Sequence, residues 1–229
     1  MKQLKKIAAA AAMTIGAVVA MTTGAIASPL GTVYTFTLDI SQAASGLPTG
    51  GPYGVVTLTQ DLNEVDVNFT LASGYVYANT GVGPQFAFNL TGAFIDSTVT
   101  LSAATATSFV KGTASPFNLT PYGMFTNALV FKSGTGGGIS ANISAPLNFS
   151  VAKTGISLDD FSLSTAKNNG QKGGFSFASD VGFVATGKTG GVAVVDADVN
   201  LPPQEVPEPA SLALLGLGLA GVAMARRRK

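Results

Sequence analysis

Strict alternation of apolar and polar residues is the feature that most constrains what this chain can fold into. In residues 33–40 apolar side chains occupy every second position, with Thr35, Thr37 and Asp39 between them, and residues 64–71 repeat the pattern. Successive side chains of a β-strand point to opposite faces, so both segments predict a strand with one buried and one solvated face. The apolar sets are Tyr34, Phe36, Leu38 and Ile40 in the first segment and Val65, Val67, Phe69 and Leu71 in the second.

Further segments have the composition of short strands, and turn clusters rich in Gly and Pro separate them. No part of residues 28–200 shows the 3.6-residue periodicity of an amphipathic helix. About ten short strands joined by such turns predict an all-β domain, an antiparallel β-sandwich or jelly roll, over residues 28–200. The further strand candidates are Val55–Gln60, Phe86–Phe94, Thr98–Leu101, Ala128–Phe131, Leu147–Ala152, Phe161–Ser164, Gly174–Ala178, Val181–Thr186 and Val192–Val199.

The N-terminal residues 1–27 have the parts of a secretory signal peptide. Lysines come first, the apolar run Ile7–Met21 follows, and Ala25 and Ala27 supply the small residues that signal peptidase reads. We therefore expect cleavage before Ser28. The alternative is a retained N-terminal membrane helix, but the run is short for a membrane span and ends before an Ala-x-Ala site.

The C-terminal residues predict a linker and a membrane segment. Residues 201–209 contain four prolines, which favour an extended polyproline conformation. In residues 210–229, the stretch Ser211–Ala225 carries no charge, and as a helix it would span roughly 22 Å. Because the hydrocarbon core is about 30 Å thick, we expect a marginal transmembrane helix, with Arg226–Lys229 left on the cytoplasmic side.

Three features follow one another in this tail: a Pro-Glu-Pro tripeptide, an apolar run and a basic cluster. They are Pro207, Glu208 and Pro209, then residues 210–221, then Arg226, Arg227 and Arg228. In this order they resemble the PEP-CTERM sorting signal found in exopolysaccharide-producing Gram-negative bacteria. Roughly residues 50 to 92 are also loosely similar to ectodomains of some proteins in this group, a similarity that brings no assigned activity.

The resemblance implies a partner and a route. An exosortase, a membrane-embedded transpeptidase-like enzyme, would cut near Pro207, Glu208 and Pro209, and the basic residues would act as the stop. The precursor would be exported, held transiently in the inner membrane by its tail, and then placed at the cell surface or in the extracellular matrix of a biofilm.

Composition excludes several classes of function. Residues 28–205 hold six basic and 11 acidic residues, a net charge of about −5, which offers no electrostatic footprint for nucleic acid. The chain has no Cys and no His, so it lacks a reactive thiol, the commonest general base and the commonest transition-metal ligand. We predict no cofactor and no catalytic residue.

Some acidic groups resemble parts of calcium loops, yet we predict no metal site. They lack the glycine and the terminal glutamate of such loops, and on a strand their carboxylates simply share the solvated face. Likewise, the Gly-x-Gly-x-x-Gly of residues 216–221 lies inside the apolar tail and has no strand before it. The acidic groups are Asp196, Asp198 and Asn200; Asp159 and Asp160; and Asp61, Asn63, Glu64 and Asp66.

The leading hypothesis is a non-enzymatic surface or matrix protein. The alternative is a module that binds exopolysaccharide, with the tyrosines as an aromatic platform for sugar rings. A less favoured alternative is a glycoside hydrolase, because two carboxylates at suitable separation would suffice, although no motif surrounds any pair. The tyrosines are Tyr34, Tyr53, Tyr75, Tyr77 and Tyr122.

Overall fold

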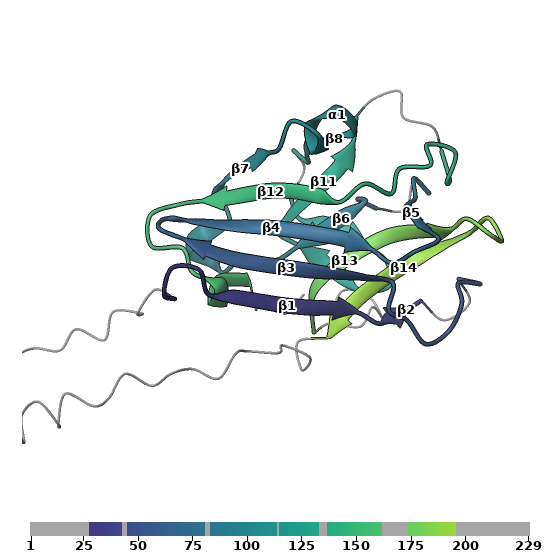
Figure 1. Ribbon diagram of the computed structural model, residues 1–229, viewed down its shortest axis with the longest axis horizontal. Helices are drawn as coiled ribbons and strands as arrows, with labels where there is room; N and C mark the ends of the chain where they lie inside the picture. The colour runs from purple at the N-terminus through teal and green to yellow at the C-terminus, as the bar shows by residue number, and fades with distance from the viewer. Residues whose placement is uncertain are drawn as a thin grey trace, which may run out of the picture.

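Two antiparallel β-sheets packed face to face form the body of the protein (Figure 1). The predicted β-sandwich is thus confirmed. The computed structural model describes residues 28–42, 45–80, 83–113, 115–132, 137–161 and 174–195.

The first sheet, sheet A, follows the alternation in the sequence. Its buried positions face the second sheet, while Thr, Ser, Asn and Asp side chains occupy the outer face. Each neighbouring pair is antiparallel. In order across the sheet the strands are β1 (Val33–Leu38), β3 (Gly54–Asp61), β4 (Glu64–Leu71), β12 (Leu147–Ala152) and β7 (Thr98–Leu101).

The second sheet, sheet B, is built around a long strand that is buried on both faces. That strand is β13 (Phe175–Phe183). A short strand, β5 (Tyr75–Tyr77), pairs with one half of it and β6 with the other half, along the same edge. In order the strands are β2 (Ile40–Ser41), β14 (Lys188–Val195), β13, β6 (Phe86–Phe88), β11 (Asn127–Phe131) and β8 (Phe109–Lys111).

Aromatic rings from both sheets meet in the core. The ring of Phe69 in β4 stacks on that of Phe86 in β6, with centroids 4.7 Å apart. Phe149 of β12 lies 5.5 Å from Phe88, and Phe36 of β1 lies 4.8 Å from Phe177 of β13. These contacts join sheet A to sheet B, so burial of the aromatic rings is the main attraction between the layers.

A small hairpin covers part of the outer face of sheet B. Its strands are β9 (Phe117–Leu119) and β10 (Gly123–Phe125). A row of small side chains crosses four strands beneath it, which lets Leu119, Tyr122 and Phe125 approach the sheet closely. The Tyr122 hydroxyl donates a hydrogen bond to the carbonyl of Gly191 at 2.8 Å. The row consists of Ala128, Ala87, Ala178 and Ala193.

Several predicted strands were wrong in extent. The segment predicted as Val33–Ile40 changes sheet at Asp39, so Ile40 lies in β2 and packs under the hairpin. The strand predicted over Phe86–Phe94 ends at Phe88. There the Asn89 side chain takes over from the ladder: it donates to the Phe175 carbonyl at 3.3 Å and accepts from Thr126 N at 3.0 Å.

Two other segments also differ from the prediction. Phe161 belongs to the 3₁₀ turn η2 (Leu158–Phe161), not to a strand. The strands predicted over 174–178 and 181–186 are one strand, β13. The short elements β5, β8, β9, β10, η1 (Gly92–Phe94) and the one-turn helix α1 (Thr105–Ser108) were not predicted.

Candidate functional site

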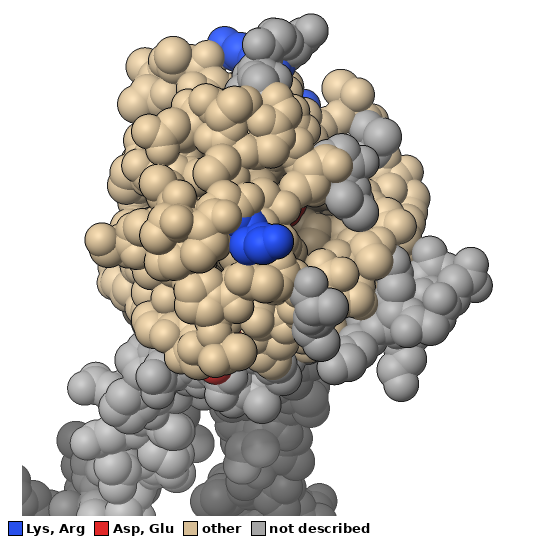
Figure 2. Space-filling view, turned by 90° about the vertical axis from the view of Figure 1, so that its right-hand side faces the viewer, with Lys and Arg blue, Asp and Glu red and all other residues tan. Residues whose placement is uncertain are grey.

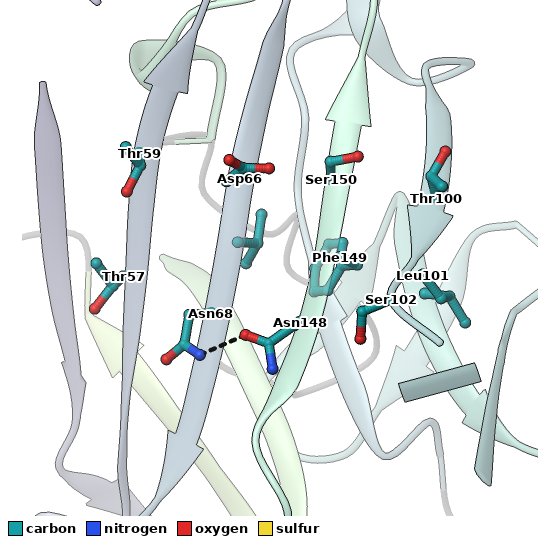
Figure 3. Close-up of a pocket in the computed structure, with 11 residues that line it drawn as sticks. Thr57, Thr59, Asp66, Asn68, Thr100, Leu101, Ser102, Asn148, Phe149 and Ser150 are labelled. Atoms are coloured by element: carbon teal, nitrogen blue, oxygen red, sulfur yellow. Dashed lines mark hydrogen bonds between the residues drawn. The ribbon is translucent and has the colours of Figure 1, made fainter. Parts of the chain in front are cut away.

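A shallow groove runs across the outer face of sheet A, and polar side chains line it (Figure 3). It has a volume of about 390 Å³. Because the strands are in register, the outward side chains form two rows that cross four neighbouring segments. One row is Thr59, Asp66, Ser150 and Thr100, and the other is Thr57, Asn68, Asn148 and Ser102.

The centre of the second row is a pair of amides. Asn68 donates from Nδ2 to Oδ1 of Asn148 at 2.7 Å (Figure 3). Thr70 donates its hydroxyl to Oδ1 of Asn68 at 3.0 Å. The backbone N–H of Asn148 donates to the Thr105 hydroxyl at 2.8 Å, which ties β12 to the one-turn helix α1. The groove therefore presents amides whose orientation is fixed before any ligand arrives.

One carboxylate stands among the described lining residues of the groove. It belongs to Asp66, which lies between Thr59 and Ser150 across the sheet. Partial desolvation, and then the carboxylates of Glu64 and Asp61, raise the pKa of Asp66 above its usual value. No basic side chain belongs to this described lining, so the charge of the lining is negative.

The chemistry of this face suits a hydroxylated polymer. Neighbouring strands lie about 4.8 Å apart, so hydroxyls, amides and the carboxylate recur at a regular spacing across the sheet. Each can exchange a hydrogen bond to water for one to a sugar hydroxyl, with a modest net gain per bond. A ligand that spans several positions would add these small gains.

The predicted aromatic platform is contradicted by the structure. All five tyrosines are buried, with at most 8 % of any side chain exposed. Tyr77 has no exposed surface and donates to the Phe69 carbonyl at 3.3 Å, and burial raises the pKa of its hydroxyl far above the usual value. Tyr34, Tyr75 and Tyr77 lie in strands, whereas Tyr53 lies just before β3 and Tyr122 lies in the turn of the β9–β10 hairpin. All five pack in the two clusters of buried residues, so none is placed for sugar stacking.

The acidic groups that resembled calcium loops do not form a metal site, and two of these carboxylates accept hydrogen bonds within the fold. Asp160 accepts hydrogen bonds from Ser157 N and from the hydroxyl of Thr91 at 2.9 and 2.7 Å, and Asp159 accepts from the Tyr34 hydroxyl at 3.0 Å. Within the described ranges no three acidic, His or Cys side chains gather as a metal site would need. Asp196, Asp198 and Asn200 lie outside the described residues.

The comparisons with known proteins bear on the tail. Residues 205–229 match the family model for the PEP-CTERM protein-sorting motif. The chain carries a PEP-CTERM sorting signal. No curated protein and no solved structure matches the chain. The motif implies an exported protein that is anchored in the membrane and then processed by an exosortase.

The residues of the PEP-CTERM signal belong to the part of the chain outside the described residues. This applies to Pro207, Glu208 and Pro209, to Arg226, Arg227 and Arg228, and to the predicted signal-peptidase site at Ala25 and Ala27. The predicted segments 1–27, 201–209 and 210–229 lie there too. Among the helices that are described, none has the length and hydropathy to cross a membrane.

Proposed function

We propose that this chain is a non-enzymatic surface or extracellular-matrix protein, released from a membrane-held precursor by an exosortase. The observation that carries the proposal is the PEP-CTERM motif over residues 205–229.

Replacing the sorting tripeptide is expected to stop the processing. In the triple variant Pro207→Ala, Glu208→Ala, Pro209→Ala, the exosortase loses the sequence it recognises, so the tail stays attached. Mass spectrometry of the protein recovered outside the cells, and of the membrane fraction, measures the C-terminus. We expect the wild type to end near residues 205 to 210, and the variant to remain in the membrane fraction, intact through Lys229.

The linker offers a matched control for this experiment. Pro202→Ala, Pro203→Ala also removes prolines from the stretch before the apolar run, but leaves the tripeptide unchanged. This variant is expected to be processed like the wild type. Extracellular wild-type protein that still ends at Lys229 would contradict the proposal.

A second function is favoured by the groove: the domain binds exopolysaccharide through the outer face of sheet A. The support is the fixed pair Asn68 and Asn148 among rows of hydroxyl side chains. Binding would proceed by hydrogen bonds spread over a long polymer, since the tyrosines are buried.

Removing the amide pair is expected to weaken retention on the host's exopolysaccharide by about tenfold. Each hydrogen bond contributes about 0.5–1.5 kcal/mol, and Asn68→Ala, Asn148→Ala removes at least two. Retention of the full-length chain on immobilised polymer measures the effect. Thr37→Ala, on the same face but outside the groove, is the control, and equal retention of all three proteins would rule the groove out.

A further inference from the structure

A second pocket lies on the outer face of sheet B, beside the β9–β10 hairpin. It has a volume of about 150 Å³. Figure 2 shows a hollow on this side of the molecule, with a small area of acidic atoms inside it and a basic side chain beside its opening. The residues that line the pocket are Gln42, Thr80, Gly83, Leu119, Thr120, Asp180, Thr189, Gly190 and Gly191.

The acid of this pocket is Asp180, in the middle of β13. It stands where the ladder changes partner: β5 pairs with the residues after it and β6 with those before it. The backbone N–H of Ala78 donates to the Asp180 carbonyl, and the Asp180 N–H donates to the Gln85 carbonyl. Residues 79–80 and 83–84 therefore lie outside the ladder at this point, and the Asp180 side chain lines the pocket.

One carboxylate oxygen of Asp180 has a structural task. Oδ2 accepts hydrogen bonds from the Thr80 backbone N–H at 3.3 Å and from the Thr80 hydroxyl at 2.5 Å. Oδ1 accepts none from the described residues, although 5 % of the residue is exposed. An asparagine at this position could accept the same hydrogen bonds from Thr80 without placing a charge in the interior. These bonds alone therefore do not explain why the residue is an aspartate.

Nothing in the described lining of the pocket neutralises Asp180. No basic residue lines it, and the Lys188 side chain packs beside Gly46. Burial of the carboxylate raises the pKa of Asp180 to about 6, against the lowering effect of the Thr80 hydrogen bonds. A positively charged ligand would provide an ion-pair partner for the Asp180 carboxylate.

The residues of the pocket walls indicate which kind of positively charged ligand would fit. Gln42, Thr120 and Thr189 contribute an amide and hydroxyls, and Leu119 is the apolar residue among the described lining. The walls are partly polar and partly apolar, and a sugar ring matches both because it carries hydroxyls on its rim and C–H groups on its faces. A lysine side chain has no hydroxyl to bond to the amide and hydroxyls of the walls. The volume is below the ~300–1,000 Å³ of sites that enclose a drug-sized ligand, so the pocket can hold no more than about one sugar ring.

We propose that this pocket binds an amino sugar, with the ammonium group on Asp180 and the ring hydroxyls on Gln42 and Thr189. The site is separate from the groove on sheet A, so a negative result for one proposed binding site does not affect the other. It would give the domain a contact with any polysaccharide that exposes unacetylated hexosamine.

The test is calorimetric titration of the full-length chain at pH 7 with a disaccharide of glucosamine. The disaccharide of N-acetylglucosamine, which lacks the charge, and a dilysine peptide, which lacks the ring, are the comparison ligands. We expect the glucosamine disaccharide to bind at least tenfold more tightly than either. Equal affinity for the acetylated disaccharide would overturn the charge-based contact, and equal affinity for dilysine would overturn the sugar.

Variants separate the pocket from the general attraction of an acidic protein. Asp180→Asn is expected to abolish the preference for glucosamine while it keeps the bonds to Thr80. Asp39→Asn also removes one negative charge, at an exposed position outside both pockets, so it is expected to leave the preference unchanged. A preference that survives Asp180→Asn, or that Asp39→Asn removes equally, would overturn the proposal.

Discussion

Phe86→Ala is expected to lower the free energy of unfolding by about 3–5 kcal/mol, because it opens a cavity between the two sheets. The Phe86 side chain has no exposed surface. Its ring centroid lies 4.7 Å from that of Phe69, 6.0 Å from Phe149 and 6.1 Å each from Phe88 and Phe177. No small movement of one neighbour can fill the space that the ring leaves, since its neighbours come from both sheets.

Urea unfolding of the full-length chain measures this loss. A natural domain is stable by about 5–15 kcal/mol, so the variant is expected to lose a large part of its stability. Leu62→Ala is the control: that side chain is 71 % exposed in the turn between β3 and β4, and its removal is expected to cost less than about 0.5 kcal/mol. Similar losses in the two variants would show that Phe86 is not central to the core.

The sequence predicted sheet A better than sheet B because one face of sheet A is exposed to solvent. Three segments, 64–71, 98–101 and 147–152, were predicted with the bounds they have in the structure. Each has one face in the core and one in water, so the sequence alternates. β13 is covered by sheet A on one side and partly by the hairpin on the other, so eight of its nine positions are buried and the alternation disappears.

Polar residues inside β13 explain why it was predicted as two strands. Ser179 and Asp180 fall between the two predicted strands, yet both lie in the ladder. Ser179 is fully buried and donates its hydroxyl to the Gln85 carbonyl at 2.6 Å. A buried polar residue with a partner far along the chain cannot be told from a turn residue by local composition.

The groove could not be predicted from the sequence for a related reason. Asn68 and Asn148 are 80 residues apart, and only the register of β4 against β12 makes them neighbours. The sorting motif is the opposite case, because all of its residues are contiguous and a family model recognises them directly. Contiguous residues were enough to identify the sorting signal, whereas the groove depends on which strands pair in the folded protein.

Asp180→Asn is expected to stabilise the fold at pH 7 by up to about 3 kcal/mol. Burial raises the pKa of Asp180 from an ordinary value of 3.8 to about 6. The folded chain therefore binds more protons than the unfolded chain between pH 4 and 6, and the contribution of Asp180 to stability falls as pH rises through that window. A tenfold change in proton affinity is worth about 1.4 kcal/mol, which sets the limit near 3 kcal/mol above pH 6. Asn keeps an acceptor for Thr80 without the charge.

Urea unfolding of wild type and variant between pH 4 and 8 measures the difference, which we expect to be near zero at pH 4 and largest above pH 6. Asp96→Asn is a control of opposite sign: its ion pair with Lys153 lowers the pKa of Asp96, so that pair adds stability at high pH and loses it as pH falls. A difference between Asp180→Asn and wild type that stays constant with pH would contradict the burial of an ionised carboxylate. With an amino sugar bound at Asp180, the substitution that stabilises the fold also removes amino-sugar binding, two outcomes that a purely structural role for Asp180 cannot produce together.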